Sequence, residues 1–220
     1  MGKLTYFLGL QVSYPTPSAI FVNQTKYIRD LLHKAGMTTS KPCPTPCKPH
    51  TQVLSTSGEP LKDPTLYRSI VGALQYLTFT KPDIAYSVNT VFQYMTNPTE
   101  VHFHMVQRIL RYIQGTLTYG IHFGPGPWHL SAYSDSDWAT DPSTKRSTTG
   151  CVVFLGANPI SWQSKRYVHL SNTSQGSGGG MEKSSLFSGI GKGGVLVVKG
   201  IVHDKCVNQA YCSCKWCGLQ

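Results

Sequence analysis

Residues 63–77 read Asp-Pro-Thr-Leu-Tyr-Arg-Ser-Ile-Val-Gly-Ala-Leu-Gln-Tyr-Leu, and this stretch decides the character of the middle of the chain. Asp63 followed by Pro64 is the preferred order of a helix cap and a first-turn proline. Apolar residues then recur at helical spacing, at Leu66, Ile70, Leu74 and Leu77. The stretch therefore predicts an amphipathic helix, which Lys81-Pro82 ends.

Two more helices follow the same pattern. Pro82 begins a helix whose apolar stripe is Ile84, Ala85, Val88, Val91, Phe92 and Met95. In Asn97-Pro98-Thr99-Glu100 we expect Asn97 to be the cap, with Glu100 three residues later. That helix ends at Gly115. The three helices and their proline turns predict a helical unit over residues 64–127.

The residues before this unit predict a hairpin, a helix and a connector. Residues 4–12 alternate as one strand, with Tyr6, Leu8, Leu10 and Val12 on one face, and a second strand follows at 20–22. Asn23 can cap a helix that Gly36 ends, so residues 1–37 form the first segment. The five prolines of residues 38–63 predict an extended connector.

The pattern changes to strands beyond residue 127. Residues 130–135, 149–155 and 160–164 predict three successive antiparallel strands, which places a second domain at 128–171. With no helix directly after it, such a sheet has an uncovered apolar face, so we expect it to be marginal or aggregation-prone. Residues 172–220 hold ten of the 21 glycines and are expected to be disordered, although residues 195–198 could form a strand.

Composition points to a polyanionic partner. The chain has 20 Lys and Arg against ten Asp and Glu, which gives a formal net charge of +10. The alternative is that this charge serves solubility. No stretch reaches the ~20 apolar residues of a membrane helix, and the N-terminus does not read as a signal peptide. Seven cysteines, an odd number, predict reduced thiols, and we expect a cytoplasmic or nuclear protein with no membrane partner.

Seven sequence blocks, in order, carry a resemblance. They are YFLGLQV at 6–12 with YIRDLL at 27–32, YRSIVGALQYL at 67–77, KPDIAYSV at 81–88, RILRYIQGT at 108–116, YSDSDWA at 133–139, RSTTG at 146–150 and WQSKR at 162–166. Over about residues 3–171 the chain resembles the end of the reverse transcriptase region and the opening of the ribonuclease H domain of Ty1/copia retrotransposon Pol polyproteins.

The resemblance implies an α+β fold. It implies a hairpin and thumb- or connection-like helices followed by an incomplete ribonuclease H-like sheet, and beyond residue 171 it stops. The hairpin would be the last palm hairpin, where a primer end rests. The family's polymerase site uses a Tyr-x-Asp-Asp block and an earlier Asp, and the 220 residues do not contain that block. We therefore expect no DNA synthesis, because phosphoryl transfer needs carboxylates to hold two Mg²⁺ ions.

The ribonuclease H site is the second implied centre. Asp135 matches the family's catalytic aspartate on the first strand, and Asp137 would share its face and help to hold Mg²⁺. The family's Ser-x-x-Glu-Ala-Glu block should follow Ser171, but the chain reads Asn-Thr-Ser-Gln-Gly-Ser there. Only Glu182 and Asp204 are acidic beyond that point, so we expect Asp135 to be vestigial. Alternatively, Asp135 and Asp137 are turn or cap residues.

Basic residues predict where nucleic acid would bind. The candidates are Lys26, Arg108, Arg111, Lys145 and Arg146, whose alternative role is a solvated surface. Trp138 and Trp162 are interpreted as core of the small sheet. The crowded cysteines at 206–217 fit a zinc site poorly, and we assign no chemistry to His102 and His104.

The sequence thus predicts a Pol polyprotein fragment whose parent performs reverse transcription and hydrolysis of RNA–DNA hybrids. We expect the fragment itself to be catalytically inactive, with no small-molecule substrate. Two alternatives remain: a nucleic-acid-binding remnant that contacts a hybrid or duplex, and a residual Mg²⁺-dependent hybrid ribonuclease.

Overall fold

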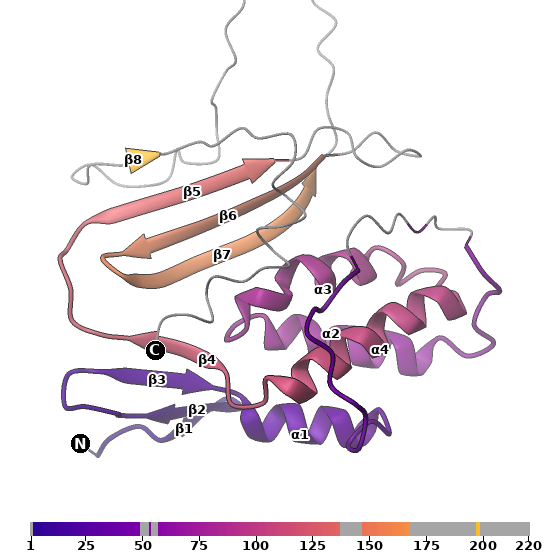
Figure 1. Ribbon diagram of the computed structural model, residues 1–220, viewed down its shortest axis with the longest axis horizontal. Helices are drawn as coiled ribbons and strands as arrows, with labels where there is room; N and C mark the ends of the chain where they lie inside the picture. The colour runs from indigo at the N-terminus through magenta and orange to yellow at the C-terminus, as the bar shows by residue number, and fades with distance from the viewer. Residues whose placement is uncertain (1, 49–52, 54–56, 137–146, 168–196, 199–220) are drawn as a thin grey trace, which may run out of the picture.

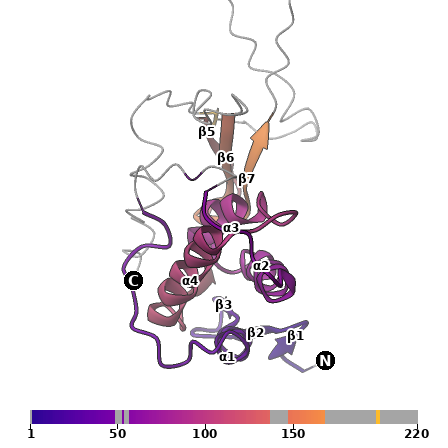
Figure 2. The same ribbon diagram turned by 90° about the vertical axis from the view of Figure 1, so that its right-hand side faces the viewer.

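The structure is a computed structural model that describes residues 2–48, 53, 57–136, 147–167 and 197–198. A helical unit lies between two β-sheets (Figures 1 and 2). Its helices are α1 (Thr25–Lys34), α2 (Thr65–Leu77), the 3-10 helix η1 (Pro82–Ile84), α3 (Ala85–Phe92) and α4 (Glu100–Gly115). The fold is mixed α and β, as the sequence predicts.

The first sheet joins the two ends of the helical unit. Its strands β1 (Tyr6–Phe7), β2 (Leu10–Ser13), β3 (Ile20–Asn23) and β4 (Gly120–Phe123) are antiparallel in that order. β4 follows α4 and was not predicted from the sequence, yet it pairs with β3 from Ile20 to Asn23. A Cβ at Gly120 would lie 2.2 Å from the Val22 carbonyl oxygen, so this pairing requires glycine. The hairpin and the helices therefore fold as one unit.

The prediction of a single strand over residues 4–12 is wrong. The chain turns at Leu8 and Gly9, whose φ angles are +47° and +80°, and Phe7 pairs with Leu10 across the turn. Leu8 lies at the tip of this hairpin and is 71% exposed, rather than on a strand face. Two positive φ angles are typical of primed hairpin turns. Alternation did not reveal the turn because leucine rarely adopts such a conformation.

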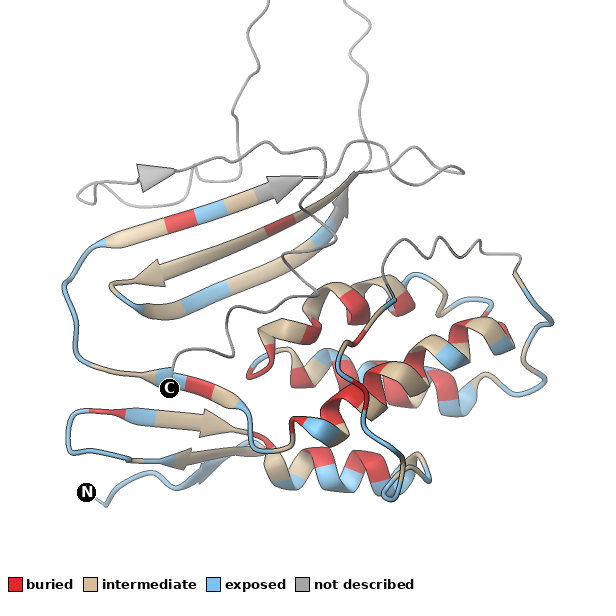
Figure 3. Ribbon diagram, in the orientation of Figure 1, coloured by how far each residue is buried: buried red, intermediate tan, exposed pale blue. Residues whose placement is uncertain are grey.

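The core is formed by the apolar faces of the four α-helices, and Figure 3 shows buried residues, in red, on each of these helices. On α2 the buried stripe differs from the predicted one, because Leu66 is 42% exposed while Tyr67 and Val71 are fully buried. The Tyr67 hydroxyl donates to the Val91 carbonyl at 2.6 Å. Burial raises the pKa of Tyr67, with Tyr94 adding to the shift, so the phenol keeps the proton that it donates.

The start of α4 also differs from the prediction. The cap is Thr99 rather than Asn97, and the third helical residue that completes a capping box is His102 rather than Glu100. The Thr99 N–H donates to His102 Nδ1 at 3.0 Å. Pro98 stays outside the helix, where its carbonyl accepts a hydrogen bond from the Leu61 N–H. His102 is thus a buried structural residue, and its ring stacks on Tyr94 with centroids 3.7 Å apart.

The second sheet confirms the predicted meander. β5 (Leu130–Ser136), β6 (Ser147–Leu155) and β7 (Asn158–Tyr167) are antiparallel neighbours, and a short strand β8 (Val197–Val198) pairs parallel to β5. A two-residue turn with Gly156 at φ +62° joins β6 to β7. The other residues of the predicted tail, 172–196 and 199–220, lie outside the described part of the chain.

The second sheet rests on the helical unit. β7 contacts α3 and β4, and Figure 1 shows it as the strand nearest the helices. Trp162 is half-buried, and its indole N–H donates to the Thr78 carbonyl of the helical unit at 2.7 Å, so this side chain links its sheet to the helices. The meander is therefore in contact with the helices along β7.

The Thr99 cap yields a stability prediction. Thr99→Ala should lower the free energy of unfolding by about 1 kcal/mol, because a buried hydroxyl that caps α4 and donates to the Ser57 carbonyl is lost. Urea unfolding followed by circular dichroism measures the change. Thr99→Ser keeps the hydroxyl and should lose much less, and equal losses in the two variants would contradict the cap.

Candidate nucleic-acid interface

α1 presents a cationic face to solvent. Ile28, Leu31 and Leu32 are buried against the core, which turns the opposite side of the helix outward. The exposed residues include the cations Lys26, Arg29 and Lys34, together with His33, and Asp30 is the acid among them. An amphipathic sequence with basic residues at these positions thus yields a basic helix face.

The neighbouring strands hold the N-terminal end of α1 in place. The Lys26 N–H donates to the Gln11 side chain of β2 at 2.9 Å, and the Thr25 N–H donates to Asn23 Oδ1. The Thr25 hydroxyl also donates to the Leu117 carbonyl beyond α4. Lys26, a predicted nucleic-acid contact, is therefore exposed at a fixed position beside the hairpin.

Arg108 and Arg111, two further predicted contacts, lie on α4 and hold the connector. Arg108 Nη2 donates to the Thr45 hydroxyl at 2.6 Å, and Arg111 Nε donates to the Lys41 carbonyl at 2.8 Å. The connector is drawn in purple where it crosses α4 in Figure 1. Cys43 is a buried residue of the connector, and its N–H donates to the Arg111 carbonyl. These two arginines thus have structural partners that sequence reasoning did not foresee.

The structure describes only part of the predicted metal site. The backbone of Asp135 pairs with Gly150 near the end of β5. Asp137, Lys145 and Arg146 lie outside the described residues. Within the described part of the chain, no three His, Cys, Asp or Glu side chains gather as ligands for a metal ion.

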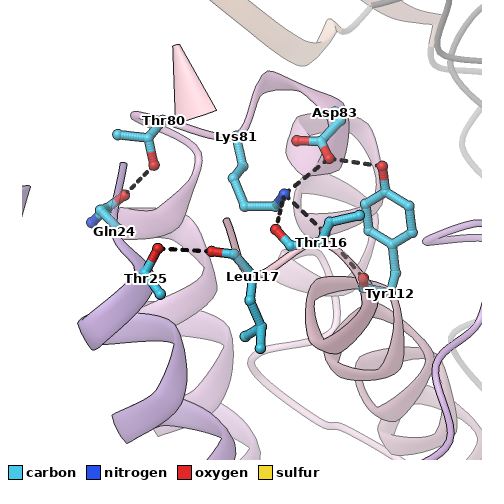
Figure 4. A network of polar contacts seen from close by, with 8 residues as sticks. All are labelled: Gln24, Thr25, Thr80, Lys81, Asp83, Tyr112, Thr116 and Leu117. Atoms are coloured by element: carbon cyan, nitrogen blue, oxygen red, sulfur yellow. Dashed lines mark hydrogen bonds and ion pairs between the residues drawn. The ribbon is translucent and has the colours of Figure 1, made fainter. Parts of the chain in front are cut away.

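A buried polar network lies where the helices meet the first sheet, and the sequence did not predict it. Figure 4 shows Lys81, which is only 1% exposed, with its ammonium 3.2 Å from Asp83 Oδ2. The ammonium also donates to the Thr116 hydroxyl at 3.0 Å. The Tyr112 hydroxyl donates to the same Asp83 oxygen at 2.8 Å. The buried charge is therefore paired and hydrogen-bonded, as burial requires.

The network extends to the start of α1. The Lys81 ammonium lies over the rings of Tyr112 and Tyr119, 5.6 and 5.4 Å from their centroids. The neighbouring Thr80 hydroxyl donates to Gln24 Oε1 at 2.8 Å (Figure 4). The sequence signal was the Lys-Pro-Asp triplet, which predicted a helix boundary and a block of the family resemblance but no buried ion pair.

An aromatic cluster supports the tip of the hairpin. The Tyr76 hydroxyl at the end of α2 donates to the Leu8 carbonyl, and the Tyr76 ring packs edge-on against Tyr27 and Phe79. Burial, and then the neighbouring Tyr76, raises the pKa of Tyr27. Leu8 and Phe79 remain largely exposed, so the hairpin tip presents apolar side chains to solvent while Tyr76 holds its backbone.

Comparison with known proteins decides the family. The chain is 48% identical over 165 residues to the Retrovirus-related Pol polyprotein from transposon RE1 of Arabidopsis thaliana. It is 46% identical over 175 residues to an uncharacterised mitochondrial protein of the same plant, of which it covers 72%. It is 34% identical over 185 residues to the Pol polyprotein from transposon TNT 1-94 of Nicotiana tabacum. The chain belongs to the Ty1/copia family of Pol polyproteins.

This Ty1/copia chain spans only a small part of the polyproteins. It covers 11% of the RE1 polyprotein and 14% of the TNT 1-94 polyprotein, but 74% and 79% of its own length is matched. No family model matches the chain, and no solved structure matches it. Among the residues that the structure describes, no helix has the length and apolar character needed to span a membrane.

The buried ion pair yields a second prediction. Lys81→Met in this Ty1/copia chain should cost about 3 kcal/mol of unfolding free energy, because Asp83 is then left without its cation. Urea unfolding measures the loss. Lys62→Met, at an exposed lysine, is the matched control and should change stability by less than about 0.5 kcal/mol. A Lys81→Met loss as small as the control would show that the pair is not stabilising.

Proposed function

We propose that this chain is a nucleic-acid-contacting fragment of a Ty1/copia Pol polyprotein and is not itself a catalyst. The observation that carries the proposal is the exposed cationic face of α1 beside the anchored hairpin. The relatives named Pol polyproteins support the parent role, which is reverse transcription and hydrolysis of RNA–DNA hybrids.

The geometry of α1 suits a phosphate backbone. Lys26 and Lys34 are separated by about 12 Å along the helix at its rise of 1.5 Å per residue. One nucleic-acid strand carries a phosphate about every 3.4 Å of helix axis, so this face spans about three or four phosphates. The adjoining hairpin resembles the place where a primer end rests, and α1 then occupies the position of a thumb-like helix.

The proposal of inactivity is supported by the missing carboxylates. The 220 residues contain no Tyr-x-Asp-Asp block, and the Glu-containing block of the family's ribonuclease H domain does not follow Ser171. Two-metal hydrolysis needs several carboxylates around one phosphate. Asp135 and Asp137 are the residues that would hold Mg²⁺ if the site worked.

Residual ribonuclease activity is the second candidate function. The arrangement of β5, β6 and β7, with Asp135 on the first of the three strands, agrees with the implied ribonuclease H-like sheet. Cleavage of a labelled RNA–DNA hybrid with Mg²⁺, beside the Asp135→Asn variant, tests this candidate. We expect no cleavage by either folded protein. Cleavage that disappears in Asp135→Asn would overturn the proposal of inactivity.

The binding proposal predicts a change in salt dependence. Lys26→Gln with Arg29→Gln should weaken binding of a labelled RNA–DNA hybrid and reduce the slope of log K against log salt by about 2, since about 0.9 is lost per phosphate contact. Fluorescence anisotropy across several salt concentrations measures the slope. Asp30→Asn on the same face should instead tighten binding.

Lys165→Gln is the control for that measurement, because Lys165 is an exposed cation on β7. This substitution should change the slope of log K against log salt by less than about 0.9, the value for one phosphate contact. Unchanged binding after both α1 substitutions would contradict a role for this helix in nucleic-acid contact.

A further inference from the structure

The turn between α2 and η1, residues 78–81, binds a different part of the molecule at each position. The Thr78 carbonyl accepts the indole N–H of Trp162 from β7. The Thr80 hydroxyl donates to Gln24, which joins β3 to α1. Lys81 reaches Thr116, just beyond α4. Three separate parts of the fold are thus joined to one short turn.

The fourth residue of the turn connects it to the hairpin. Phe79 packs against Tyr76 with ring centroids 5.6 Å apart, and the Tyr76 hydroxyl holds the Leu8 carbonyl at the hairpin tip. Thr80 and Lys81 are 2% and 1% exposed. Because closely packed interiors transmit displacement rather than absorb it, a shift at one attachment of this turn reaches the others.

The second sheet is held to the helical unit at two points of β7. At the start of the strand the Asn158 side chain makes two hydrogen bonds with the backbone of Gly124, at 2.8 and 2.9 Å. Trp162 makes the second attachment four residues later, about 13 Å along the strand. With one of these attachments alone, only the contact of β7 with α3 and β4 would oppose rotation of the sheet about residues 124–129. The Trp162 bond to Thr78 fixes the angle of the sheet.

We propose that the turn 78–81 couples the two sheets, with Trp162 as the positioning residue that sets the sheet carrying Asp135 relative to the hairpin and α1. That this coupling would align two contacts with a bound nucleic acid rests on the proposed function. The coupling itself does not rest on it. It gives a role to the hydrogen bond between the indole of β7 and the helical unit.

Hydrogen exchange of the whole chain, followed by mass spectrometry without nucleic acid, tests the coupling. Trp162→Phe removes the N–H donor and replaces the indole with a smaller aromatic ring. We expect exchange to rise roughly three- to tenfold in β7, in the turn 78–81 and in the hairpin 6–13, the range for the loss of one hydrogen bond. Trp128→Phe is the matched control, since Trp128 is 90% exposed, and should leave the exchange unchanged.

Tyr76→Phe tests the same path from the other end, because it removes the hydroxyl that holds the hairpin tip. We expect faster exchange in the turn and around Trp162, and a combined variant whose effects are not additive. Changes confined to the element that carries each substitution, with additive effects, would overturn the proposal. Should Trp162→Phe unfold the chain, the exchange of β7 in Tyr76→Phe decides the question. Since no nucleic acid is present, a failure of binding does not affect this result.

Discussion

The fold depends on a buried charge, the Lys81 ammonium, and on the groups that neutralise it. Removal of a lysine from water is costly, and its attraction to Asp83 compensates only because Thr116 and Tyr112 satisfy the remaining hydrogen bonds. Lys81 lies in the turn after α2, Asp83 lies in η1, and Tyr112 and Thr116 lie at the end of α4. An ion pair whose members lie near to each other in the sequence therefore fixes elements that are far apart in it.

The cations of the chain divide between structure and surface. Arg108 and Arg111 bind carbonyl and hydroxyl groups of the connector, and Lys81 is enclosed by the core, whereas Lys26 and Arg29 face solvent on α1. Guanidinium groups suit the first task because one planar group can bind several acceptors. A net charge of +10 thus overstates the surface that is open to a polyanion. Only the packing separates the two kinds of cation.

Local signals predicted much of the fold, while features set by distant partners were missed. Gly36 after α1, Asp63-Pro64 before α2 and the meander of β5 to β7 follow from turn and cap chemistry within a few residues. β4 is stable because β3 lies beside it, and four residues carry no strand signal by themselves. Lys26 was found because exposure needs no partner, but the burial of Lys81 depends on Thr116 and Tyr112. His102 was missed because its cap role is usually filled by Glu or Gln.

The two sheets stand in an unequal relation to the core. In the first sheet, β3 precedes the first helix and β4 follows the last one. Their pairing joins the two ends of the helical unit, so this sheet is part of the same structural unit as the core. The second sheet has its own ladder but takes its orientation from Trp162 and Asn158, both on β7. An edge strand is prone to pair with other chains, and contact of β7 with α3 and β4 restrains that tendency. The position of β7 therefore depends on the helical unit. A substitution that removes the contacts of Trp162 would expose this sheet edge first.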